Sequence, residues 1–287
     1  MSVTAAYLSQ SLATFRSQAL TSLIGTASGA GQSATEGGAP DFSALLANKV
    51  GDVQGLSGAG RNPALYDPES AYKMMSVING NDVLYKAQFS ELSQMESWVA
   101  QMENAGQKLS GIDASTGDQE IASRVQEFVA QYNGWVERFN PDMQRGGVLA
   151  DTQAAQLARH ELKESIRNIF NGARDGVHGL ADLGIAIDEK SGAASFDSAR
   201  FDSLLATNRK GAVDALQEFS ANFTKSASLL NSDGNIIPNR LDNLSKVIDY
   251  FDEHKVSLQN EFGTGDAPRS SGRVAEALAA YNQRYGA

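Results

Sequence analysis

The spacing of hydrophobic residues along the chain changes within residues 180–219, and this change limits where helices can form. Ile185 and Ile187 alternate with small or polar residues, a spacing of two that predicts a short strand. The turn that follows contains Gly192, which can adopt the positive φ that tight turns require. Alternation resumes after the turn, so the sequence predicts a β-hairpin near residues 184–197. The predicted hairpin residues are Leu183, Gly184, Ile185, Ile187, Gly192, Phe196 and Asp197.

A helix is predicted to start directly after this hairpin. The carboxylate of Asp197 can accept a hydrogen bond from a free backbone amide of the next turn and so cap that helix. Phe201 and Leu205 then lie on one helical face. Asn208 is a second candidate cap, and helical spacing continues after it as far as Phe219. The hairpin is therefore expected to lie between helices in a chain that is helical almost throughout.

Three other stretches carry apolar residues spaced by threes and fours, which is the pattern of bundle helices and coiled coils. They lie within residues 85–109, 121–139 and 241–262. Pro141 is expected to stop the second helix, because the residue before a proline avoids the α region. Residues 79–82 are expected to interrupt or kink the first. The predicted packing or interaction seams consist of Tyr85, Leu92, Met95, Val99, Met102, Phe128, Tyr132, Trp135, Leu244, Ile248, Phe251 and Leu258.

The predicted fold class is therefore mainly α, with long antiparallel helices that form a bundle or coiled coil and a small β-hairpin insertion. Residues 65–287 are expected to form this helical domain. Residues 1–64 are predicted to be a flexible segment rich in Gly, Ser and Ala, with too little apolar surface to order by itself. Composition leaves two interpretations open, a disordered tail or a segment that folds on assembly.

Charge and composition argue against several classes of function. The chain has 34 acidic and 24 basic residues, a formal net charge of −10. Because Lys and Arg form no run, neither nucleic acid nor a membrane is an expected partner. The absence of cysteine excludes disulfides, thiolate zinc sites and a Cys nucleophile. With no apolar run near the ~20 residues that span a bilayer and no Sec-type signal, we expect a cytoplasmic protein or one exported without such a signal.

The sequence offers little for catalysis. His160, His178 and His254 are scattered, and although His160 and Glu164 lie one helical turn apart, no third ligand stands at metal spacing. Phosphate-binding glycine loops and a G-x-S-x-G nucleophile motif are both missing. The protein is therefore expected not to be an enzyme and to have no catalytic residues, no cofactor and no metal.

The hairpin stretch and its neighbours resemble a known family. They are similar to the C-terminal half of the flagellar filament cap proteins, also called hook-associated protein 2, over about residues 118–262. The pieces that carry this resemblance, in chain order, are Phe128-Val129-x-x-Tyr132-Asn133, Gly147-Val148-Leu149-Ala150-Asp151, Leu180-Ala181-Asp182-Leu183-Gly184-Ile185, the Gly192 turn, Phe196-Asp197, the spaced Phe201, Leu205, Val213 and Phe219, and Ser232-Asp233-Gly234.

The resemblance implies a function in flagellar assembly. Cap proteins leave the cell through the flagellar type III export channel, form an oligomeric plate at the filament tip and help flagellin subunits to fold into place. Implied partners are copies of the chain itself, flagellin or hook-associated proteins, and an export chaperone, and the implied location is the extracellular flagellum. One departure is clear: residues 110–120 alone separate the first predicted coil from the second, so the β-rich head that family members carry there is missing.

Two hypotheses follow from the sequence. In the first, the chain is an exported structural protein of the flagellum that self-associates through seams such as Leu92/Met95/Val99 and Leu244/Ile248/Phe251. In the second, it is a cytoplasmic helical interaction protein, such as a flagellar export chaperone or regulator, that has a cap-like core. The first requires the N-terminal segment for export, whereas the second predicts retention in the cell and one dominant partner. A helical bundle with no flagellar role is a third, less specific reading.

Overall fold

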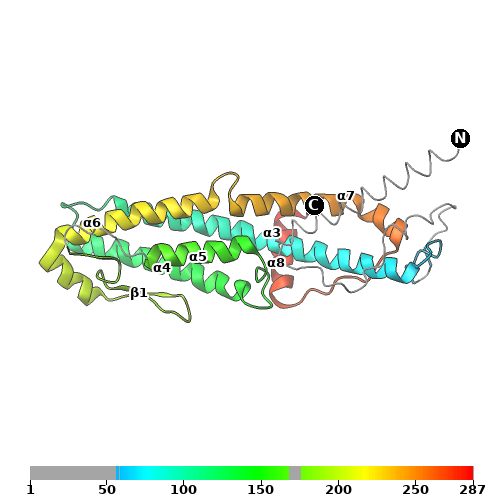
Figure 1. The fold of residues 1–287 in the computed structure, drawn as a ribbon, viewed down its shortest axis with the longest axis horizontal. Coiled ribbons are helices and arrows are strands. Elements are labelled where there is room, and N and C mark those ends of the chain that lie inside the picture. Colours follow the sequence, from blue (N-terminus) through cyan, green and yellow to red (C-terminus); the bar gives the residue numbers. More distant parts are fainter. Residues whose placement is uncertain (1–55, 58, 168–175, 287) are drawn as a thin grey trace. The chain divides into compact units, whose positions relative to one another are not determined.

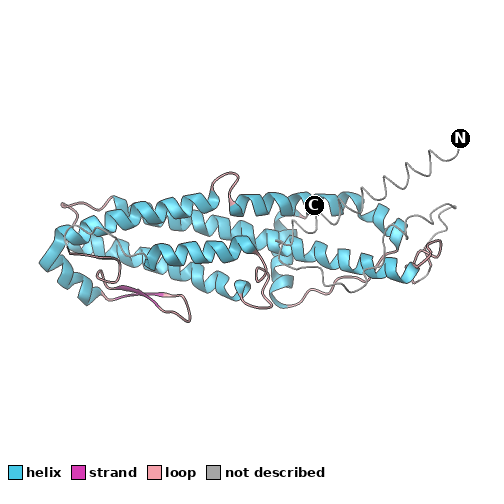
Figure 2. Cartoon of the chain, in the orientation of Figure 1, coloured by secondary structure: helices cyan, strands magenta, loops and turns pink. Residues whose placement is uncertain are grey.

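The fold of the chain, a computed structural model, is described for residues 56–57, 59–167 and 176–286 (Figure 1). Helices dominate it, and a two-stranded sheet interrupts them (Figure 2), so the predicted fold class is confirmed. The elements are α3 (Pro68–Ser110), α4 (Asp118–Met143), α5 (Gln153–Arg167), β1 (Ile185–Ile187), β2 (Ala194–Phe196), α6 (Ser198–Asn231), α7 (Ile236–Phe262) and α8 (Gly272–Tyr285).

The chain divides into two compact units. We call Glu91–Asn239 the hairpin unit, and the remainder, made of Met1–Ser90 and Arg240–Ala287, the terminal unit. Residues 1–55 lie outside the described ranges, so a flexible segment over residues 1–64 and a domain over 65–287 stay predictions. None of the helices in the described ranges combines the length and the apolarity needed to cross a membrane.

Helix α3 has no break at residues 79–82, so the expected interruption is wrong. The side chains of Asn79 and Asp82 bind other partners, so they do not compete for the backbone hydrogen bonds of the helix. The Asn79 amide donates to the carbonyls of Thr264 (2.9 Å) and Asp266 (3.0 Å). Asp82 lies 3.0 Å from the ammonium of Lys86, one helical turn later. Tertiary contacts have thus overridden a weak local propensity.

The core of the hairpin unit is aromatic. The Phe128 ring meets the rings of Phe219 and Phe223 edge to face, with centroids 5.1 and 4.8 Å apart. Gly106 of α3 lies against this cluster, and a Cβ there would stand 3.0 Å from the Phe223 ring. The Ser220 hydroxyl donates to the Gly106 carbonyl at 2.7 Å. Glycine therefore lets α6 approach α3 closely at a position where the seam spacing alone would favour a larger residue.

Two of the predicted helix signals are confirmed and one is wrong. Asp197 accepts from the amide of Arg200 at 3.0 Å and caps α6. Asn208 leaves helical geometry (φ −147°, ψ 60°) inside α6 and accepts from the amide of Gly211 at 3.1 Å, so it caps the helix that follows the kink. Pro141, in contrast, does not stop α4, which continues to Met143. A proline in the last turn removes only one helical hydrogen bond, and this loss is small enough to be tolerated.

In the described part of the terminal unit, the first half of α3 lies with α7 and α8. The rings of Tyr85 and Phe251 stack with centroids 6.4 Å apart. The amide of Asn62 donates to the last carbonyls of α7, those of Asn260 (3.3 Å) and Glu261 (2.9 Å). These carbonyls have no partner inside the helix, so Asn62 satisfies groups that a helix end leaves open.

Candidate functional site: the hairpin and its pocket

The hairpin is antiparallel, with Ile185 opposite Phe196 and Ile187 opposite Ala194. Gly184 precedes the first strand with φ +80°, and a Cβ there would stand 2.6 Å from the carbonyl oxygen of Asp197. Only glycine fits this geometry without strain. The predicted hairpin over residues 184–197 is thus confirmed as part of the fold.

The turn of the hairpin is organised by Asp188. Its carboxylate accepts from the backbone amides of Lys190 (3.1 Å) and Ser191 (2.7 Å) and from the Ser191 hydroxyl (2.7 Å). These hydrogen bonds, first of all those from Ser191, lower the pKa of the Asp188 carboxyl. Gly192 follows with φ +75°, as its position in the predicted turn requires.

Asn133 fastens the second strand to α4. Its amide nitrogen donates to the carbonyl of Ala194 at 2.8 Å, and its amide oxygen accepts from the Ala194 N–H at 2.7 Å. The side chain therefore pairs with the strand as a neighbouring strand would. Because β2 is only three residues long, this contact satisfies a large share of its outer edge.

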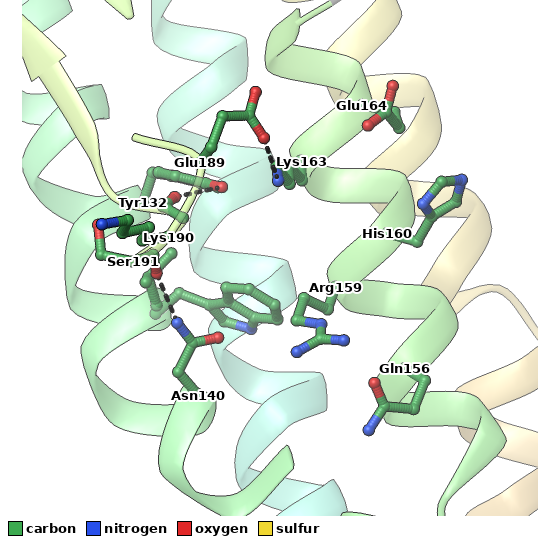
Figure 3. A pocket seen from close by; sticks show the side chains of 13 residues that line it. Tyr132, Asn140, Gln156, Arg159, His160, Lys163, Glu164, Glu189, Lys190 and Ser191 are labelled. Carbon is green, nitrogen blue, oxygen red and sulfur yellow. Dashed lines mark hydrogen bonds and ion pairs between the residues drawn. The ribbon is translucent and has the colours of Figure 1, made fainter. Parts of the chain in front are cut away.

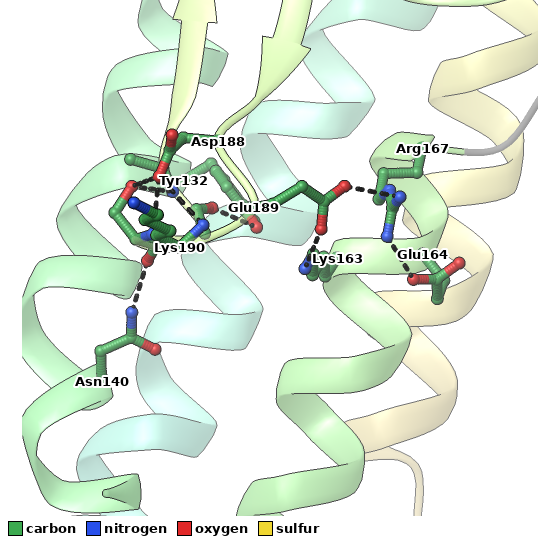
Figure 4. A network of polar contacts seen from close by, with 11 residues as sticks. Tyr132, Asn140, Lys163, Glu164, Arg167, Asp188, Glu189 and Lys190 are labelled. Atoms are coloured by element: carbon green, nitrogen blue, oxygen red, sulfur yellow. Dashed lines mark hydrogen bonds and ion pairs between the residues drawn. The ribbon is translucent and has the colours of Figure 1, made fainter.

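Two further side chains of α4 hold the turn (Figures 3 and 4). The Tyr132 hydroxyl donates to the carbonyl of Gly192 at 3.1 Å, and the Asn140 amide donates to that of Ser191 at 2.7 Å. Burial raises the pKa of Tyr132 to about 12, so its hydroxyl keeps the proton that it donates at any physiological pH.

Charged side chains join the same turn to α5. Glu189 pairs with Lys163 at 3.2 Å and with Arg167 at 2.7 Å, and Arg167 also reaches Glu164 at 3.4 Å (Figure 4). The side chain of Glu189 is 64% exposed. Ion pairs this exposed contribute about 0–1 kcal/mol each, so they orient the turn more than they stabilise it.

A pocket of about 340 Å³ opens between α4, α5 and the hairpin turn. In Figure 3 the Arg159 side chain extends from α5 toward Asn140. The pocket is lined by Tyr132, Trp135, Val136, Asn140, Gln156, Arg159, His160, Lys163, Glu164, Glu189, Lys190, Ser191 and Gly192.

Three hydrogen-bond donors of this pocket lack an acceptor among the described residues. Arg159 and Lys190 have no ion-pair or hydrogen-bond partner for their charged groups among the described residues. The indole N–H of Trp135 is buried and has no acceptor within the same ranges, an arrangement that costs about 1–3 kcal/mol. Over these ranges, no three or more His, Asp or Glu side chains are placed to hold a metal ion.

The structure places every predicted seam residue in the interior of the chain. All twelve are at most 7% exposed. Leu92, Met95, Val99, Met102, Phe128, Tyr132 and Trp135 belong to the hairpin unit, and Tyr85, Leu244, Ile248, Phe251 and Leu258 belong to the terminal unit. These residues pack within their own chain in this conformation, and a role in binding another chain stays a prediction.

Sequence reasoning missed the polar residues of the site. These are Asn133 and Asn140. It also missed Arg138, which is not part of the pocket lining and whose guanidinium bonds to Glu91 (2.6 Å), Gln94 (2.9 Å) and Asp142 (2.9 Å). Glu91 and Asp142 are 5% and 1% exposed, so this cluster joins α3 to α4 through buried charges. No spacing rule pairs residues 47 positions apart; a charged residue inside an apolar stripe is the only signal that the sequence carries.

Comparison with known proteins identifies the region that contains this site. The family described as "Flagellar hook-associated protein 2 C-terminus" matches residues 98–266, which run from α3 to the loop after α7 and include the hairpin. A solved structure of the flagellar cap protein FliD from Escherichia coli, domains D1-D2-D3, is similar at 18% identity and a TM-score of 0.40. That similarity covers 46% of this chain and 37% of the E. coli chain. Among curated proteins, none matches this chain.

Proposed function

This chain belongs to the flagellar hook-associated protein 2 family, and we propose that it is an exported structural and assembly protein of the bacterial flagellum. In this proposal it associates with copies of itself and contacts flagellin or hook-junction subunits. The observation that carries the proposal is the family match over residues 98–266, which contains α4, α5, the hairpin, α6 and α7. Fold alone would not support it, because one fold can serve many functions.

The role we propose is mechanical. Asn133, Tyr132 and Asn140 hold the hairpin turn against α4 with four hydrogen bonds between side chain and backbone. At about 0.5–1.5 kcal/mol each, these bonds are strong enough to keep a short hairpin in place on the surface of a helical unit. A rigid, exposed turn suits contact with a neighbouring subunit, whereas the buried seams supply the stiffness behind it.

The chain departs from the family pattern in one respect that bears on its position in the flagellum. Residues 111–117 connect α3 directly to α4, which leaves no room at this point for the β-rich head that the resemblance implies. We therefore propose a cap-like component without that head, for which the filament tip and the hook junction are both candidate locations.

Localisation tests the proposal. The tagged chain is followed by immunoblot in cells, culture supernatant and sheared filaments, with and without a working flagellar export gate. We expect it outside the cell only when the gate works, and we expect deletion of residues 1–64 to abolish export. Retention inside the cell in both backgrounds would contradict the proposal and favour a cytoplasmic chaperone or regulator, whose partner binding the same deletion would spare.

A further inference from the structure

We propose that the pocket between α4, α5 and the hairpin turn binds a carboxylate, and that its occupant is an exposed Asp or Glu side chain of a second copy of this chain. The inference rests on the proposed self-association and adds a specific contact to it. It concerns the hairpin unit alone, and all residues that carry it lie between positions 132 and 192.

The charges of the lining indicate the class of ligand. Three cations and two carboxylates line the pocket, which leaves one net positive charge. Both carboxylates are already paired with neighbouring cations, whereas Arg159 and Lys190 lack partners among the described residues. A single carboxylate would neutralise this excess. A polyphosphate or nucleic acid would bring more negative charge than the pocket can balance, so the lining favours a monoanion.

The geometry places donors on both sides of the ligand position. Arg159 extends from α5 toward Asn140 of α4 (Figure 3), and Lys190 belongs to the hairpin turn on the opposite wall. A guanidinium can grip a carboxylate with two parallel hydrogen bonds. Trp135 adds an independent observation, because it lines the same pocket with an indole N–H that lacks an acceptor among the described residues. The groups of this pocket that lack partners among the described residues are therefore hydrogen-bond donors, and a ligand that binds them must supply an acceptor.

The charge of the whole chain indicates the source of that acceptor. With a net charge of −10, two copies repel each other at long range. A local site where the abundant carboxylates of one copy meet cations of the other would offset this repulsion, and complementary charge at such a site fixes orientation. A volume of about 340 Å³ admits a projecting side chain but not a helix, whose diameter is about 10–12 Å.

Sedimentation velocity of the full chain tests the inference with charge-matched variants. The pocket variant is Arg159→Gln/Lys190→Gln. The control is Arg145→Gln/Lys225→Gln, which removes the same charge from exposed residues of the hairpin unit outside the pocket lining. We expect the dissociation constant for self-association to rise about tenfold or more in the pocket variant, or at least about 1.4 kcal/mol, and to remain near wild type in the control. Circular dichroism verifies that both variants are folded.

A small probe identifies the group that is bound. N-acetyl-aspartate N-methylamide should inhibit self-association of the wild-type chain and should not inhibit it in the pocket variant. The matching asparagine derivative, which has the same shape without the charge, should have no effect. Inorganic phosphate serves as a third probe, and binding of phosphate without any effect of the aspartate derivative would overturn the inference.

The outcomes separate this inference from the proposed function. If the wild-type chain is exported and self-associates, but the pocket variant associates equally well, the proposed function stands and the pocket assignment is wrong. Equal weakening in the pocket and control variants would show that only net charge matters, which also overturns it. A wild-type chain that stays monomeric at all concentrations would overturn both the inference and the self-association on which it rests.

Discussion

Both units of the chain contain buried apolar residues, but their most prominent internal contacts differ in kind. In the hairpin unit, Phe128, Phe219 and Phe223 form an edge-to-face cluster that is at most 1% exposed. In the described part of the terminal unit, the side-chain amides of Asn62 and Asn79 each donate hydrogen bonds to two backbone carbonyls. Apolar burial depends on area and tolerates small shifts, whereas these amide contacts depend on direction. Sequence periodicity reveals the first kind of interaction and hides the second.

The largest effect that this comparison predicts is that of Phe128→Ala. Removal of a buried phenyl ring from a packed core costs about 3–5 kcal/mol, and here it also removes two edge-to-face contacts. Both tryptophans of the chain, Trp98 and Trp135, belong to the hairpin unit. Tryptophan fluorescence during urea unfolding therefore reports on this unit directly, and a loss below about 1 kcal/mol would show that the aromatic cluster does not hold it together.

Much of the fold is predictable because apolar spacing and helix caps are local signals. The seams, the hairpin and the caps at Asp197 and Asn208 are all of this kind. The two errors have different physical origins. At residues 79–82 the local propensities are worth about 1 kcal/mol or less per residue, and the contacts of Asn79 with the loop after α7 outweigh them. Pro141 lies in the last turn of α4, where few helical hydrogen bonds remain to be lost.

The site is less predictable than the fold, because its key contacts join side chains to the backbone of a distant segment. Asn133 and Ala194 are 61 positions apart, and nothing in the composition of α4 distinguishes Asn133 from a solvent-facing residue. The pocket adds a second difficulty. Arg159 has no ion-pair partner among the described residues, and sequence periodicity carries no information on which cations are paired.

The next prediction concerns Tyr132 and alkaline pH. Its pKa is about 12 in the folded chain against an ordinary 10.0, because burial disfavours the charged form. The folded state thus holds this proton more tightly, so the stabilisation is complete below pH 10 and is lost as pH rises toward 12. Two pKa units correspond to at most about 2.7 kcal/mol. Urea unfolding followed by tryptophan fluorescence should show this loss, and Tyr132→Phe should reduce its slope over that interval.

A control is needed, because other groups titrate at high pH. Tyr66→Phe changes an 80% exposed side chain and should leave the pH dependence of stability as it is in the wild type. At neutral pH, Tyr132→Phe should cost only the hydrogen bond to Gly192, about 0.5–1.5 kcal/mol. Parallel alkaline curves for wild type and Tyr132→Phe would refute the assignment of the effect to this hydroxyl.

Asn62→Ala is the corresponding test in the terminal unit. The Asn62 side chain is 1% exposed, bonds to two carbonyls at the end of α7 and accepts from the amide of Ala64. Loss of these part-buried hydrogen bonds should cost about 1–3 kcal/mol. Native-state hydrogen exchange at residues 259–264 measures the local effect. Asn260→Ala makes the same chemical change at an exposed side chain of the same helix, and equal effects of the two substitutions would contradict a special role for Asn62.

The smallest effect is expected at Val256, which is 70% exposed on α7. Val256→Ala removes little buried area and slightly improves helix propensity, so stability should change by less than about 0.5 kcal/mol. Leu258, two residues further along the helix and 7% exposed, provides the contrast, because Leu258→Ala should cost about 2–5 kcal/mol. Hydrogen exchange along α7 measures both. A cost above about 1 kcal/mol for Val256→Ala would mean that another surface covers this valine in solution.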